Sequence, residues 1–143
     1  MSTMGLDVGQ KRIGVAIAAS EGMLAIPLTV IDRIDEEADI KAILTLINEW
    51  GINRIVVGLP RSMDGSIGKQ AEEVIAFSKA FSQRISVPVD TWDERLSTVA
   101  AEHLMRDAGM KGGKRKAHRD ALAAAIILQA YLDRGRSLSP ENG

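Results

Sequence analysis

A chain of 143 residues with 45% hydrophobic and 26% charged residues has the size and composition of one globular domain. It contains no cysteine, which excludes a disulfide framework and a thiolate-bound metal, and its net charge of -1 excludes an overall field that attracts nucleic acid. The N-terminus lacks the pattern of a secretory signal and no apolar run reaches membrane-spanning length, so we expect a cytoplasmic protein.

The first expected element is a β-hairpin over residues 4–18, in which two apolar runs flank a polar break. Asp7 stands just before the break, where it either hydrogen-bonds the turn backbone or is kept for chemistry. This stretch alone favours the turn role. Gly5, Gly9 and Gly14 weaken the strands, and they indicate a bulge or the close approach of a ligand or another backbone.

The middle of the chain changes from strand to helix periodicity. Residues 23–34 alternate in hydrophobicity and predict a third, antiparallel strand, in which Pro27 requires a bulge, an early position or an open edge. Residues 35–50 follow helical spacing and end before Gly51. Residues 54–60 are continuously apolar, as in a parallel strand covered on both faces. We therefore predict an α/β fold with a mixed sheet.

A second helix is expected over residues 69–83, and a strand over residues 85–92, where Pro88 indicates an edge position or a late start. Glu94 follows this strand, at the rim where open α/β sheets bind ligands. The alternative is that it only complements the dipole of the next helix, which we expect to end at Gly109.

A basic segment over residues 111–119 precedes an apolar helix that we expect to start at Asp120. Charge runs are usually solvated, and an acid in the first helical turn is explained by the helix dipole alone. We place the domain at residues 1–135 and expect a disordered tail over residues 136–143.

Three carboxylates, Asp7, Glu94 and Asp120, lie at expected strand and helix ends and together form an oxygen-only ligand set. Such a set suits Mg²⁺ or Mn²⁺, and two ions about 3.5 to 4 Å apart can activate water and stabilise the leaving oxygen in phosphodiester cleavage. We therefore predict that these three residues are catalytic and bind two metal ions. The residues that we predict to contact nucleic acid are Lys11, Arg12, Arg95, Lys114, Arg115, Lys116 and Arg119.

Four groups of residues in chain order resemble the YqgF/RuvX family, which is named for Holliday junction resolution and is associated with nuclease maturation of pre-16S rRNA. They are Leu6-Asp7-Val8-Gly9 with Arg12-Ile13-Gly14-Val15-Ala16, Val57-Gly58-Leu59-Pro60 with Asp64-Gly65, Asp93-Glu94-Arg95-Leu96-Ser97-Thr98, and Asp120-Ala121-Leu122-Ala123-Ala124. The resemblance implies an RNase H-like fold, in which three antiparallel strands lead into two parallel ones with helices on both faces. The family's acidic positions fall on Asp7, Glu94 and Asp120.

The main hypothesis is a metal-dependent endonuclease that acts on structured RNA, with pre-16S rRNA or a ribosomal precursor particle as the partner. A second is a Holliday junction resolvase acting on branched DNA, which would need two active sites; the sequence leaves monomer or homodimer open. The sugar-kinase, actin and chaperone group shares the Asp-x-Gly hairpin but needs a second lobe. A non-catalytic RNA-binding ribosome-assembly factor is the remaining alternative.

Overall fold

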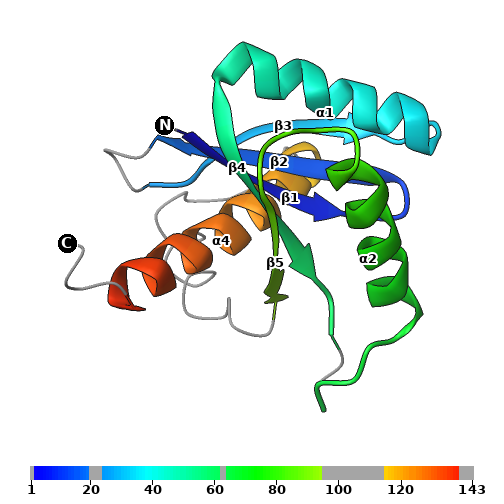
Figure 1. The fold of residues 1–143 in the computed structure, drawn as a ribbon. Coiled ribbons are helices and arrows are strands. Elements are labelled where there is room, and N and C mark those ends of the chain that lie inside the picture. The colour runs from blue at the N-terminus through cyan, green and yellow to red at the C-terminus, as the bar shows by residue number, and fades with distance from the viewer. Residues whose placement is uncertain (1, 20–23, 62–63, 95–114, 139–143) are drawn as a thin grey trace.

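A five-stranded mixed sheet forms the centre of the fold (Figure 1). In a computed structural model, the described residues are 2–19, 24–61, 64–94 and 115–138, with only the backbone described for 115–119 and 135–138. In spatial order the strands are β3 (Ile26–Asp32), β2 (Arg12–Ala19), β1 (Ser2–Val8), β4 (Ile52–Leu59) and β5 (Val89–Asp93). The first three are antiparallel, and β1, β4 and β5 run parallel. This confirms the predicted mixed sheet.

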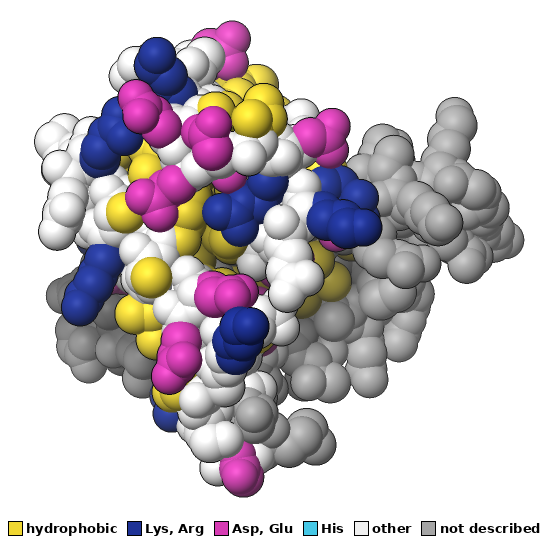
Figure 2. Space-filling model, turned by 90° about the vertical axis from the view of Figure 1, so that its right-hand side faces the viewer, with side chains coloured by type: hydrophobic (Ala, Val, Ile, Leu, Met, Phe, Trp, Pro, Cys, Tyr) yellow, Lys and Arg dark blue, Asp and Glu magenta, His cyan; other side chains and the backbone are white. Residues whose placement is uncertain are grey.

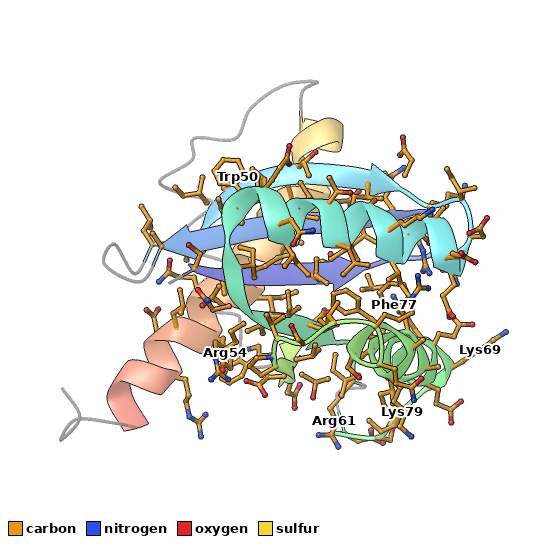
Figure 3. The ribbon with its side chains drawn as sticks, turned by 45° about the horizontal axis from the view of Figure 1, so that its top comes forward. Trp50, Arg54, Arg61, Lys69, Phe77 and Lys79 are labelled. Carbon is orange, nitrogen blue, oxygen red and sulfur yellow. The ribbon has the colours of Figure 1, made fainter. Side chains whose placement is uncertain are left out.

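Helices cover both faces of the sheet, as predicted. The first face packs against α1 (Glu36–Trp50) and α2 (Lys69–Ser82), which bury a core of aliphatic side chains and two phenylalanines. The second face packs against α4 (Arg115–Leu138) through small and branched side chains. In Figure 3, the labelled Phe77 points from α2 toward the sheet, whereas Lys69 and Lys79 point away from it.

Local signals account well for α1. The carboxylate of Asp35 accepts a hydrogen bond of 2.8 Å from the backbone N–H of Ala38, which satisfies one of the free donors of the first turn. The helix ends at Gly51, whose φ of 61° lies in the left-handed region that glycine adopts without steric cost. Both ends agree with the prediction from the sequence.

Two of the four prolines, Pro27 and Pro88, lie at the edges of the sheet. Pro27 lies on edge strand β3, opposite a register irregularity between Val15 and Ala16 of β2, as its missing N–H requires. Pro88 precedes β5, the other edge strand, which starts at Val89. The predicted start at residue 85 was therefore too early, and both options that Pro88 indicated are confirmed, because the strand starts late and lies at the edge.

The last helix begins five residues before its predicted start. Because Arg115 to Arg119 are residues that helices tolerate well, the turn that we expected at this position is helical. Asp120 is therefore not in the first turn, where a helix dipole would stabilise it. The helix also extends to Leu138, past the predicted domain end at residue 135. Within the described residues, no helix has both the length and the apolar character needed to cross a membrane.

Candidate active site

The alternation of side chains along the strands places the site on the sheet face that packs against α4. Met4, Leu6 and Val8 belong to the core under α1 and α2, so Asp7 faces the opposite side. On β4, Val57 belongs to that same core and Gly58 therefore faces α4. Residues near the ends of β1 and β4 thus contribute to one edge of the α4 face.

Gly14 of β2 brings Asp120 to this edge. Gly14 pairs with Asp7 across the antiparallel ladder, and a Cβ atom on Gly14 would overlap the backbone carbonyl of Asp120. Only a residue without a side chain lets α4 lie this close to the sheet. The expectation that a glycine of the hairpin marks a close backbone approach is confirmed at Gly14, and the approaching backbone belongs to a predicted site residue.

Gly58 makes room for Glu94 in a similar way. A Cβ atom on Gly58 would lie 2.9 Å from Oε2 of Glu94 and would overlap Cδ1 of Ile127. The Glu94 carboxylate therefore rests over the end of β4, between its own strand β5 and β1. We had not predicted a role for Gly58, although a glycine inside a continuously apolar strand is a signal of close approach.

Burial and mutual repulsion change the acidity of this cluster. Burial, followed by the charge of Asp120, raises the pKa of Asp7 from its ordinary value of 3.8 to about 6. Burial also raises the pKa of Glu94 from 4.5 to about 7, with further contributions from the charges of Asp7 and Asp93. The three predicted acids therefore interact electrostatically, and the site holds more negative charge than its surroundings neutralise.

Arg12 partly compensates this charge. Its Nε donates a hydrogen bond of 2.6 Å to Oδ2 of Asp120, and this contact raises the pKa of the Arg12 guanidinium. The Arg12 side chain is half exposed, whereas that of Asp120 is 28% exposed. Arg12 is one of the predicted phosphate-binding residues, so the structure joins it to a predicted metal ligand.

The donor set fits a divalent cation. Asp7, Glu94 and Asp120 offer only carboxylate oxygens, which hard cations such as Mg²⁺ and Mn²⁺ prefer. Burial and like charge raise the pKa values of Asp7 and Glu94, and a bound cation would favour their charged forms. As the side chains stand, the described residues contain no group of three or more acidic or histidine side chains close enough to enclose an ion. Asp120 is held by Arg12 instead.

Arg33 stabilises the turn between β1 and β2 through a hydrogen bond to its backbone. We had predicted no role for this residue. Arg33 Nη1 donates to the carbonyl of Gly9 at 2.9 Å, and its Nε donates to the buried carboxylate of Asp39 at 2.9 Å. The guanidinium also lies 5.1 Å from the ring centroid of Phe77. Arg33 therefore fixes the turn that carries Lys11 and Arg12 to both helices of that face.

Gly9 has a structural role within this turn. Its N–H donates to the carbonyl of Arg12 at 2.9 Å, and a Cβ atom on Gly9 would lie 2.9 Å from that same oxygen. The tight turn alone therefore requires glycine. The prediction that a ligand comes close to the hairpin at Gly9 stays a prediction.

The other predicted nucleic-acid contacts are only partly visible. Arg95 and Lys114 lie outside the described residues, and Arg115, Lys116 and Arg119 are described as helical backbone without their side chains. Figure 2 shows the end of the molecule at which β1 ends, where Lys and Arg side chains alternate with Asp and Glu. The coloured residues therefore show charges of both signs on this face. The predicted phosphate contacts of Lys11 and Arg12 stay predictions.

Comparison with known proteins places this geometry in a family. The profile of the RuvX family, described as a Holliday junction resolvase, matches residues 1–134. The chain belongs to the RuvX family. A RuvX relative from Desulforamulus reducens, named "Putative pre-16S rRNA nuclease", is 48% identical over 135 residues, which cover 94% of this chain and 98% of the relative. One from Chloroflexus aurantiacus with the same name is 48% identical over 134 residues, covering 94% and 88%.

Solved structures with the same fold include nucleases that act on junctions. Thermus thermophilus RuvC in complex with Holliday junction substrate superposes with a TM-score of 0.65 at 18% identity, covering 94% of this chain and 96% of RuvC. The fowlpox virus resolvase bound to junction DNA has a TM-score of 0.56 at 10% identity, covering 94% and 98%. At these identities the likeness shows the fold, and it confirms the RNase H-like architecture of this RuvX protein.

Proposed function

We propose that this chain is a metal-dependent endonuclease that hydrolyses phosphodiester bonds in structured RNA, with pre-16S rRNA as its substrate. The observation that carries the proposal is the gathering of Asp7, Glu94 and Asp120 at one edge of the α4 face, where two of the three have raised pKa values. The names of relatives at 48% identity supply the substrate. A chain without cysteine suits the reducing conditions of the cytoplasm, where we place the reaction.

Each acid has a distinct position in the proposed site. Asp7 is central, because it interacts with both other carboxylates, while Glu94 and Asp120 approach it from β5 and α4. We assign these three residues as ligands of two Mg²⁺ or Mn²⁺ ions. Ions held there supply activation of a water nucleophile and stabilisation of the leaving oxygen.

The cations of the turn position the substrate. Lys11 and Arg12 are exposed beside Asp120, so they can contact the phosphates on either side of the bond that is cut. Arg95, Lys114, Arg115, Lys116 and Arg119 complete the proposed nucleic-acid contacts. Contacts of this kind carry no sequence information and weaken steeply with salt, so the structure of the RNA selects the cleavage site.

A second candidate is resolution of four-way DNA junctions, which the description of the matching family and the shared fold with junction-bound RuvC favour. It requires two sites in a symmetric dimer, whereas rRNA cleavage requires one. The candidates are separated by incubating the purified protein with precursor 16S rRNA or a four-way DNA junction, and with ATP for the sugar-kinase alternative. Each incubation is run with Mg²⁺, with Mn²⁺ and with chelator. We expect metal-dependent cleavage of the precursor RNA. Cleavage of the junction alone supports the resolvase, and cleavage of neither substrate contradicts both.

A further inference from the structure

An open cleft lies beside Asp120, between the β1–β2 turn and the first turn of α2. It has a volume of about 480 Å³ and is lined by Gly9, Gln10, Lys11, Arg12, Gln70 and Asp120. The turn and α4 supply residues that the proposed reaction already uses. Gln70, from α2, belongs to none of the motifs that carry the family resemblance. The fold alone does not assign a role to this residue.

The two glutamines stand at the boundary of this cleft. Gln10 and Gln70 also line a smaller cavity of about 20 Å³ behind the turn, together with Arg33 and Glu73. Both residues are exposed, and neither side-chain amide has a hydrogen-bond partner among the residues that the structure describes. Two amides from distant parts of the chain are therefore available to a ligand in the cleft.

The chemistry of the lining favours a sugar over a base. Proteins hold unpaired bases by stacking them on aromatic rings or arginine planes; no aromatic residue lines this cleft, and the guanidinium of Arg12 in its lining is paired with Asp120. A phosphate needs donors only, which Lys11 and Arg12 provide. A side-chain amide offers both a donor and an acceptor, which is the pairing that a hydroxyl group needs. The hydroxyl that distinguishes RNA from DNA is the ribose 2′-OH.

We propose that Gln10 and Gln70 form a ribose subsite, which binds the 2′-hydroxyl of the nucleotide next to the scissile phosphate while Lys11 binds the adjoining phosphate. The proposal rests on the proposed nuclease function, because Asp120, one of the proposed metal ligands, lines the cleft. Through this subsite the site selects an RNA strand by its sugar, without reading its sequence.

The turn that presents Gln10 is rigid enough for this task. The hydrogen bond from Gly9 to the carbonyl of Arg12 closes the turn at 2.9 Å, and Arg33 holds the Gly9 carbonyl from the opposite side at 2.9 Å. Gln70 lies in the first turn of α2, which packs into the core through Ala71 and Val74. Both glutamines are thus carried by backbone that the turn hydrogen bonds and the core packing hold in place.

The test compares an all-ribose precursor fragment with the same fragment carrying 2′-deoxynucleotides on both sides of the cleaved bond. Single-turnover cleavage is measured for the wild type, Gln10→Ala, Gln70→Ala and the double variant. We expect the wild type to cleave the all-ribose fragment about tenfold faster, as one or two lost hydrogen bonds predict. In the variants this ratio should fall toward one. Gln83→Ala, at the exposed far end of α2, is the matched control and should keep the full ratio.

Binding of both fragments in chelator, measured by fluorescence anisotropy, separates this proposal from the nuclease itself. Tighter binding of the all-ribose fragment that depends on both glutamines supports the subsite even if the protein cuts nothing, an outcome that would contradict only the nuclease. A ratio that stays near ten in Gln10→Ala and Gln70→Ala, or a wild type that treats both fragments alike, would overturn the ribose subsite and leave the nuclease standing.

Discussion

Arg12 at the start of β2 and Asp120 in the second turn of α4 form an ion pair with 2.6 Å between Nε and Oδ2. Both partners have a proposed role that this pair prevents, since Asp120 would bind metal and Arg12 would bind phosphate. The pair therefore supplies positive charge to the carboxylate cluster until a metal ion binds Asp120 and a substrate phosphate binds Arg12.

Replacing Arg12→Gln should raise the affinity for Mg²⁺ about two- to fivefold, because Asp120 no longer has to leave an exposed ion pair. Isothermal titration calorimetry measures this change. Cleavage should slow in the same variant, since a phosphate contact is lost. Lys11→Gln is the matched control: it removes a neighbouring cation that forms no ion pair with Asp120 among the described residues, and Mg²⁺ affinity should not change. A weaker affinity in Arg12→Gln would contradict the competition.

Asp7→Asn should stabilise the metal-free protein at neutral pH. Because the folded-state pKa of Asp7 is raised from 3.8 to about 6, the carboxyl group contributes most stability at low pH and loses it as the pH rises through about 4 to 6. The amide avoids this cost, so we expect about 2 kcal/mol of added stability at pH 7.5 and little difference at pH 4. Thermal unfolding in chelator should show a Tm about 4 to 8 °C higher at pH 7.5. A variant less stable than the wild type at that pH would show that the burial of Asp7 is not unfavourable.

Asp39→Ala should cost about 3 kcal/mol of unfolding free energy, because it leaves the Arg33 guanidinium largely buried without its partner. Arg54 and Asp90 provide the matched control, since their pair of 2.8 Å is 46% and 40% exposed. Arg54→Ala should cost less than about 1 kcal/mol, because Asp90 keeps its hydrogen bond from the Tyr131 hydroxyl. Urea denaturation measures both. Equal losses of unfolding free energy would mean that the pair of Arg33 and Asp39 stabilises the protein no more than an exposed ion pair does.

Gly58→Ala should reduce cleavage about 10- to 100-fold, because the added methyl group displaces the Glu94 carboxylate. The contact with Ile127 should also cost about 1 to 3 kcal/mol of stability. Gly51→Ala serves as the control, since it imposes about 1 kcal/mol of strain at a φ of 61° with no atom within 4 Å of the new methyl group. It should destabilise the protein without slowing the single-turnover rate. If the cleavage rate falls in proportion to the loss of unfolding free energy in both variants, Gly58 has no specific role in placing the Glu94 carboxylate.

The sequence specified those parts of the fold that depend on short-range signals. Asp35 and Gly51 bound α1 because a cap acts within one turn of helix. The start of α4 was wrong because its basic residues form helix as readily as loop, and only packing decides between them. Sequence alternation could have placed Gly58 on the side of Asp7, but the contact with Glu94 depends on how β4 and β5 are paired.

The sequence predicted which residues form the candidate site but not the contacts between them. Asp7, Glu94 and Asp120 were found because carboxylates at strand ends are unusual, and the family resemblance selected the same three. The pair of Arg12 with Asp120 and the support of the turn by Arg33 join residues that are distant in the chain. No periodicity reveals such pairs, since they arise only when the sheet is assembled. The amides of Gln10 and Gln70 meet at one cleft for the same reason.

The most direct test of the proposed site is single-turnover cleavage of precursor 16S rRNA in Mg²⁺ by Asp7→Asn, Glu94→Gln and Asp120→Asn, beside Glu49→Gln in the exposed last turn of α1. Each of the three site variants should fold, as judged by circular dichroism, and should lose at least about a hundredfold in rate, while Glu49→Gln cuts like the wild type. If Asp7→Asn and Glu94→Gln cut the precursor as fast as the wild type, the three carboxylates are not the catalytic site.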